Sequence, residues 1–216
     1  MSLTATLVGD DIVLDSLSDM AKCVPIALRK CILKEGAILA GNMKKGIRDQ
    51  APGGVAFKPL AASTRKMKKN KSKALIMYGD LMRSINVTEV GDIKTGGAAF
   101  VGVHRMAKAK GKTGGRRRTL LVNIAAIHEY GTKPFKIPVT PRLRRFFWAM
   151  YLKGVFRKPL RKATKVINHP GVPKRSYIRT AFEAWKVGAS ERIAWSVIAE
   201  LSKQVRAGSG AKGELA

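Results

Sequence analysis

The residues best suited to ligate a metal or carry a proton are three histidines, His104, His128 and His169. None has a second ligand at metal-binding spacing. His128-Glu129 matches the first half of the zinc-helix pattern H-E-x-x-H, but Thr132 stands where the second histidine belongs. The sequence also contains no G-x-S-x-G elbow and no phosphate-binding Walker loop. We therefore predict no metal, no cofactor, no small-molecule substrate and no enzymatic activity. His128 is expected to be a structural residue at a helix end.

Positive charge is the strongest chemical signal. The sequence has 42 Lys and Arg against 14 Asp and Glu, a formal net charge of +28. The basic residues concentrate in three zones, 58–73, 105–118 and 142–165. A surface of this kind is neutralised by nucleic acid, an acidic protein surface or an anionic membrane. The candidate contacts to DNA or a partner are Arg116, Arg117, Arg118, Arg142, Arg144 and Arg145.

Aromatic residues lie among the arginines of the third zone, in Phe146-Phe147-Trp148 and Tyr151. This composition is compatible with stacking on bases. Aromatic residues on one helical face are also typical of a core or an interface, and no nucleic-acid-binding motif is present. Charge therefore indicates contact with polyanions, without indicating that a base sequence is read.

Several classes of protein are excluded by composition. No stretch approaches the roughly 18 consecutive apolar residues of a membrane span. Residues 1–15 have neither the basic nor the apolar region of a secretory signal, so synthesis in the cytoplasm is expected. Cys23 and Cys31 are eight residues apart in a helical pattern and are predicted to stay reduced.

The hydrophobic fraction of 45% is sufficient for a core, and the aromatic fraction of 6% makes that core aliphatic. Residues 3–15 alternate loosely and predict a hairpin or a strand with a cap. From residue 16 the apolar period becomes helical, which predicts a long amphipathic helix over 16–49 that ends at Pro52-Gly53-Gly54. Its apolar stripe comprises Leu28, Ile32, Leu39, Met43 and Ile47.

The middle of the chain alternates short elements with turns. Asp80 is the predicted N-cap of a short helix ending at Ser84. Residues 85–90 and 98–103 are β-branched and alternating, and predict paired antiparallel strands. Further predicted elements are a flexible basic loop over 105–118, a helix over 121–130 that ends at Gly131, and a short strand over 135–139.

The last predicted element is a helix over about 176–205. Its apolar residues are spaced by three or four, and we expect its buried stripe to comprise Ile178, Phe182, Trp185, Ala189, Ile193, Val197 and Leu201. We predict an α+β fold with long amphipathic helices on one face of a small antiparallel sheet. A single domain would cover 1–205, with a basic helical insertion at 140–170 and a flexible tail at 206–216.

Three segments, taken in order, resemble the virion-morphogenesis proteins of tailed bacteriophages, the tail-completion or neck group. Residues 75–85 are similar to the pattern L-x-x-T/S-G-x-L-x-x-S-I, and residues 125–131 to A-x-I-H-x-F/Y-G. Residues 173–182 resemble I-P-x-R-P-F-L-R-x-A-F, with Ser176 where the group usually has proline. The residues that carry the resemblance are Gly79, Leu81, Ser84, His128, Gly131, Pro173, Arg175 and Phe182.

The resemblance implies a structural virion protein at the head–tail joint. Such a protein forms a homo-oligomeric ring, hexameric by resemblance, and completes the tail or neck so that it connects to the DNA-filled head. The implied partners are neighbouring neck or connector proteins, tail-terminator or tail-tube proteins and phage genomic DNA, with no membrane. An alternative expectation is a basic protein that binds nucleic acid without sequence specificity.

Overall fold

The computed structural model describes residues 10–68, 72–76, 79–92, 98–107 and 120–212, and for 10–13, 16 and 204–212 it describes the backbone alone. The chain divides into two compact units, where the sequence suggested one domain over 1–205. Unit 1 comprises Met1–Leu39, Val87–Val101 and Trp185–Ala216. Unit 2 comprises Ala40–Asn86 and Gly102–Ala184.

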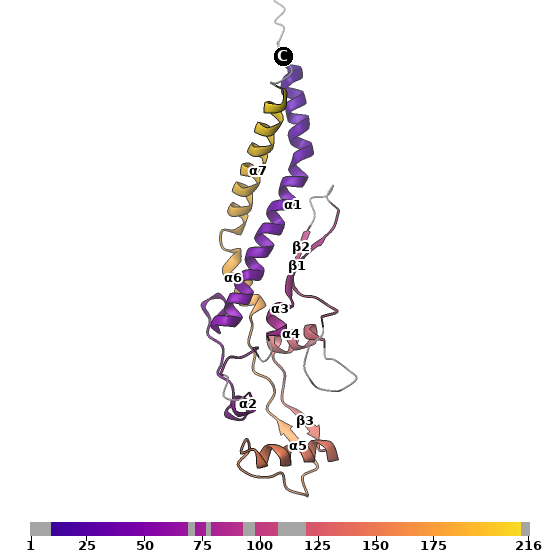
Figure 1. Cartoon of the computed structure of the whole chain (residues 1–216), viewed down its shortest axis with the longest axis vertical. Helices are drawn as coiled ribbons and strands as arrows, with labels where there is room; N and C mark the ends of the chain where they lie inside the picture. The colour runs from indigo at the N-terminus through magenta and orange to yellow at the C-terminus, as the bar shows by residue number, and fades with distance from the viewer. Residues whose placement is uncertain (1–9, 69–71, 77–78, 93–97, 108–119, 213–216) are drawn as a thin grey trace, which may run out of the picture. The chain divides into compact units, whose positions relative to one another are not determined.

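The fold is α+β, as predicted (Figure 1). The elements in chain order are α1 (Asp10–Asp49), the 3-10 turn η1 (Pro52–Gly54), α2 (Ala62–Met67), α3 (Asp80–Arg83), β1 (Ile85–Val90), β2 (Ala98–Val103), α4 (Leu121–Tyr130), β3 (Phe135–Pro138), α5 (Pro141–Leu152), β4 (Val166–His169), α6 (Ile178–Lys186) and α7 (Ala189–Lys212).

Helix α1 is longer than predicted. Residues 10–15, assigned to a hairpin or strand, are its first turns, and 3–9 lie outside the described residues. The prediction was wrong there because Leu14, three residues before Leu17, continues the helical spacing upstream of residue 16. The helix continues through Pro25, and it ends before Pro52, as predicted. Among the predicted stripe residues, Leu39, Met43 and Ile47 are buried, whereas Leu28 and Ile32 are half-buried.

The strands form two separate two-stranded sheets, β1–β2 and β3–β4, rather than one small sheet. The bounds of β1 and β2 are those predicted. Strand β4 was not predicted, because four residues in a basic stretch carry little signal of their own. Its pairing with β3 is antiparallel, with Phe135 opposite His169 and Pro138 opposite Val166. The rings of Phe135 and His169 stack at 4.7 Å.

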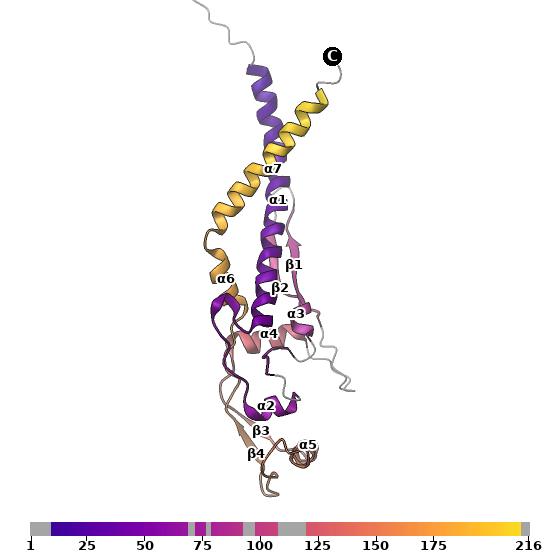
Figure 2. The ribbon, with the colours of Figure 1, turned by 60° about the vertical axis from the view of Figure 1, so that its left-hand side comes forward.

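In unit 1, α1 contacts the β1–β2 hairpin on one side and α7 on another (Figures 1 and 2). Gly36 permits the close approach to the hairpin, since a Cβ atom there would lie 3.1 Å from Val87 Cγ1. Arg29 forms an ion pair with Glu89 of β1, and Lys30 forms one with Glu200 of α7.

The predicted final helix is two helices. The break lies at Val187–Gly188, and Gly188 has a positive φ of 67°. Helix α7 then continues to Lys212, so 206–212, expected to be a flexible tail, are helical. The expectation that Phe182 lies in the core is wrong, since this side chain is 41% exposed. Tyr177 and Ala181 of the same segment are buried instead.

The start of α3 also differs from the prediction. Gly79, with a left-handed φ of 76°, occupies the N-cap position, and Asp80 is the first helical residue. Asp80 therefore contributes as an acidic residue in the first turn, where a carboxylate interacts favourably with the helix dipole.

Candidate functional site

Residues 125–131 and 173–182 meet in unit 2, at the end of α4 and the start of α6. The side chain of Glu129, 6% exposed, connects them. Its carboxylate accepts hydrogen bonds from the Ser176 hydroxyl at 2.6 Å and from the backbone N–H groups of Tyr177 (2.9 Å), Ile178 (3.0 Å) and Arg179 (3.0 Å). A negative charge thus satisfies three N–H groups at the start of α6.

Backbone contacts on both sides of Glu129 reinforce this junction, which we call the α4–α6 junction (residues 128–132 and 171–179). The Arg175 N–H donates to the His128 carbonyl at 2.7 Å. Thr132 exchanges two hydrogen bonds with Val172, one from its own N–H at 3.0 Å and one to its hydroxyl at 2.8 Å. The two segments are therefore held by paired hydrogen bonds over several residues.

Gly131 is required at the junction for two reasons. Its φ of 75° and ψ of −178° lie in a region that is essentially restricted to glycine. A Cβ atom at this position would also lie 2.9 Å from the Val172 carbonyl oxygen. The predicted end of α4 at Gly131 is confirmed, and the Gly131 N–H donates to the Ile127 carbonyl.

Arg175 is buried, and the neighbouring His128 is half-buried. Burial and the positive charges of Arg175 and Lys68 lower the pKa of His128 to about 4. The buried Nδ1 atom of His128 has no hydrogen-bond partner among the described residues. Burial also lowers the pKa of Arg175, whose guanidinium donates to the carbonyl groups of Lys58 (3.3 Å) and Pro59 (3.5 Å). His128 thus lies at the end of α4, as predicted, and the lowered pKa favours its neutral form.

The first of the three segments lies in the same unit. Leu81 is buried, and the hydroxyl of the buried Ser84 donates to the Leu81 carbonyl at 2.8 Å. Helix α3 contacts α4, the helix that ends at the junction. Pro173 is exposed at the junction. Within these segments, Gly79 and Gly131 therefore occupy turns, Glu129 caps α6, and Leu81 and Ser84 are buried.

The insertion predicted at 140–170 consists of α5, β4 and the turns between them. Thr140 caps α5, since its Oγ1 accepts from the Leu143 N–H at 3.2 Å, and Pro141 occupies the first turn. The predicted contact residues Arg142 and Arg145 are exposed on this helix. Arg144 has a structural role, because its guanidinium donates to the carbonyl groups of Arg161 and Thr164, both at 2.9 Å. Arg116, Arg117 and Arg118 lie outside the described residues.

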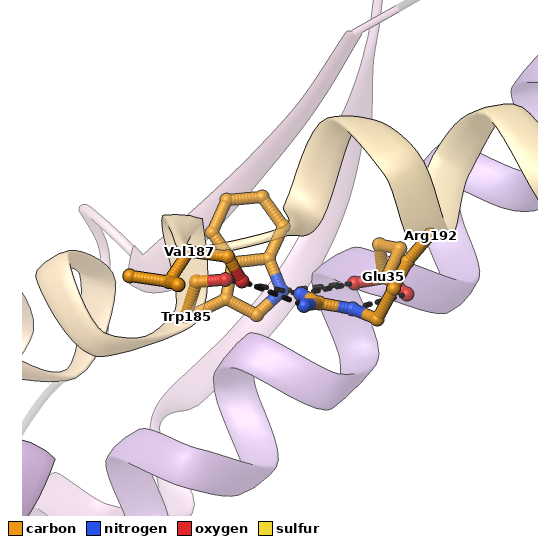
Figure 3. Close-up of polar contacts among 4 residues, drawn as sticks. All are labelled: Glu35, Trp185, Val187 and Arg192. Carbon is orange, nitrogen blue, oxygen red and sulfur yellow. Dashed lines mark hydrogen bonds and ion pairs between the residues drawn. The ribbon is translucent and has the colours of Figure 1, made fainter.

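A second polar cluster lies in unit 1, where α7 begins (Figure 3). The buried Glu35 carboxylate accepts from Trp185 Nε1 at 2.9 Å and from Arg192 Nη2 at 3.2 Å. Arg192 also donates to the carbonyl groups of Val187 (2.9 Å) and Trp185 (3.0 Å). The arginine thereby spans the break between α6 and α7 and joins it to α1.

The burial of Glu129 and Glu35 was not predicted from the sequence, although each is far along the chain from other acidic residues. Glu129 is the only acidic residue between Asp92 and Glu183, and Glu35 the only one between Asp19 and Asp49. A lone acid among many bases is a candidate for a buried, hydrogen-bonded carboxylate.

The described residues hold no group of three or more His, Cys, Asp or Glu side chains placed to bind a metal. None of the described helices has the length and apolar character needed to cross a membrane. Cys23 and Cys31 are free thiols, as predicted.

No protein-family model matches this chain, and neither a curated protein nor a solved structure matches it significantly.

Proposed function

We propose that this chain is a non-enzymatic structural protein of a tailed-phage virion. It completes the tail or neck and joins the tail to the DNA-filled head as a homo-oligomeric ring, hexameric by resemblance. The protein is made in the host cytoplasm and functions in the neck of the particle, against neighbouring connector and tail-terminator or tail-tube proteins.

The α4–α6 junction is the observation that carries this proposal. Residues 125–131 and 173–182 are far apart in the chain, yet the carboxylate of Glu129 and the Arg175–His128 hydrogen bond hold them together. Residues recurring in such caps and turns indicate a shared fold rather than shared chemistry. They support membership of a group that works by assembly, consistent with their roles in packing.

Deletion of the gene from the phage that encodes it tests the proposal. The expected result is separate filled heads and complete or nearly complete tails by electron microscopy, with joining restored when the chain is supplied in trans. Mass spectrometry and immunogold labelling of intact particles should place the chain at the neck. Normal particles that lack the chain would contradict the proposal.

One observation favours a second candidate, a basic protein that binds nucleic acid without sequence specificity. Residues 130–182 contain 14 Lys and Arg and no Asp or Glu. For this candidate, the affinity for single- or double-stranded oligonucleotides would fall steeply with salt and depend little on base sequence. A shallow salt dependence, or no binding near physiological salt, would exclude it.

A further inference from the structure

The exposed face of α5 combines apolar and basic side chains in an arrangement that the fold does not use. Phe146 is 43% exposed, Trp148 52% and Leu152 68%. Arg142 and Arg145 are exposed on the same helix. No residue of α5 is fully buried, although Leu143, Phe147 and Tyr151 on its other side are half-buried. We use the name α5 face for the exposed residues Arg142, Arg145, Phe146, Trp148 and Leu152.

The two aromatic residues of the α5 face have ring neighbours within their own segment. Phe147 of the same helix packs against Phe156 at 5.1 Å and meets Phe146 edge-on at 5.8 Å, and Trp148 contacts Tyr151 at 5.6 Å. The two hydrogen bonds from Arg144 fasten the turn at 161–164 to the helix. Preorganised side chains lose little entropy on docking, so this face is suited to a partner of defined shape.

Its charge is not neutralised within its own segment. The basic residues that follow α5, Lys153, Arg157, Lys158, Arg161, Lys162 and Lys165, are all exposed. No acidic residue occurs between Glu129 and Glu183. Glu129 caps α6, and Glu35, Glu89 and Glu200 form ion pairs in unit 1. Because residues 130–182 contain no acidic side chain, the α5 face is suited to negative charge supplied by another molecule.

The pattern on the helix favours a protein over a nucleic acid. Three i, i+4 pairs run along the face: Arg142 with Phe146, Arg145 with Ala149, and Trp148 with Leu152. The small Ala149 lies in the middle row, between the larger aromatic residues, where a partner side chain can insert. Tryptophan, phenylalanine and arginine are enriched in protein interfaces, and an aliphatic side chain such as Leu152 offers no surface for base stacking.

We propose that the α5 face docks an acidic amphipathic helix of another protein, with apolar residues between Phe146 and Trp148 and carboxylates against Arg142 and Arg145. This inference deepens the proposed function and rests on it, since it assigns the chemistry of one virion partner. The basic turns at 153–165 form the rim of the contact.

A designed peptide probe tests the proposal with the full-length chain. The peptide is helical, with leucines on one stripe and glutamates on both flanks. A matched peptide carries glutamine in place of glutamate. Fluorescence anisotropy measures the affinity of each, alongside an oligodeoxythymidine and phosphatidylcholine–phosphatidylglycerol vesicles.

We expect the glutamate peptide to bind at least about tenfold more tightly than the glutamine peptide. Two variants, Arg142→Glu with Arg145→Glu and Trp148→Ala with Leu152→Ala, should each weaken binding at least about tenfold. The control variant Lys45→Glu with Arg48→Glu changes the net charge equally on exposed positions of α1 and should bind as the wild type does. Circular dichroism verifies that the variants are folded.

Three results would overturn the proposal: no binding of the glutamate peptide, equal binding of the glutamine peptide, or tighter binding of the oligonucleotide or vesicles. Absence of the chain from particles would contradict the proposed function alone. Failure of peptide binding by a chain that is present in particles would contradict the α5 assignment alone.

Discussion

Glu129 and His128 are adjacent at the end of α4 but have opposite electrostatic surroundings. The Glu129 carboxylate is surrounded by hydrogen-bond donors at the start of α6. Burial of the His128 imidazole, together with the positive charges of Arg175 and Lys68, disfavours its protonation. Glu129 therefore accepts hydrogen bonds from the start of α6, whereas the surroundings of His128 favour its neutral form.

His128 should make stability fall in mild acid. Its pKa is about 4 in the folded chain and 6.5 in the reference state, so the unfolded chain takes up the proton first as pH falls. The stabilising contribution is present above about pH 6.5 and is lost toward pH 4. Urea unfolding across this range should show a weaker pH dependence for His128→Asn than for the wild type. The control is His104→Asn, at an exposed position. If His128→Asn kept the pH dependence of unfolding seen in the wild type, the lowered pKa of His128 would be contradicted.

Glu129→Gln should lower the free energy of unfolding by about 2–3 kcal/mol, because an amide NH₂ would face backbone N–H donors. Chemical denaturation followed by circular dichroism measures the change. Asp49→Asn, at an exposed position near the end of α1, should change stability by less than about 0.5 kcal/mol. Equal stabilities of the two variants would mean that the cap contributes little.

At the scale of the elements, replacing two glycines by alanine distinguishes the effect of backbone geometry on stability from the effect of helix propensity. Gly131→Ala should cost more than about 2 kcal/mol, since its φ of 75° is strained for alanine and the new Cβ would approach the Val172 carbonyl. Gly41→Ala, in α1, meets nothing within 4 Å and should stabilise by about 0.5–1 kcal/mol. Thermal unfolding of both variants checks these opposite signs, and a shift of the same sign in both would refute the distinction.

The break between α6 and α7 depends on the contact of Glu35 with Arg192. A double-mutant cycle of Glu35→Gln and Arg192→Met should give a coupling energy of about 1–2 kcal/mol, because Glu35 is buried. The exposed pair Asp19–Lys22, at 3.0 Å on α1, should give at most about 0.5 kcal/mol. Coupling energies in the reverse order would show that burial does not set the strength of these pairs.

At the scale of the whole molecule, charge opposes self-association and favours acidic partners. Six copies at +28 each carry a formal charge of +168. Salt screens both repulsion and attraction between exposed charges, since the Debye length falls from about 10 Å at 0.1 M to about 3 Å at 1 M. The two kinds of contact should therefore respond to salt in opposite directions.

Accordingly, ring formation by the purified chain should increase as salt rises from about 0.05 to 0.5 M, whereas docking of the α5 face to an acidic partner should weaken. Mass photometry measures the oligomer and anisotropy the docking. The chain with Arg142→Glu and Arg145→Glu should show less salt dependence of docking. Rings that dissociate as salt rises would show instead that ion pairs between copies hold them together.

Local signals in the sequence predicted much of the fold. Helical spacing in α1 and α4, alternation in β1 and β2, and the glycine after Tyr130 each act over a few residues, so each was readable in isolation. The break at Gly188 was not readable, because the apolar spacing from Trp185 to Ala189 continues in phase across it. Strand β4 and the role of Glu129 were missed because their partners lie elsewhere in the chain.

The sequence by itself therefore determined the α+β class, the positions of most elements and a strongly basic surface, since these follow from short-range periodicity and from composition. Only the tertiary structure decided which charged side chains form hydrogen bonds and ion pairs within the protein. In the folded chain Glu129 and Glu35 are buried, Arg144 connects α5 to the turn at 161–164 by hydrogen bonds, and the α5 face is exposed. The physical reason is that the role of a charged side chain depends on the donors and acceptors that folding brings to it. These lie 17 and 20 residues away for Arg144, and 47 or more residues away for Glu129 and Glu35.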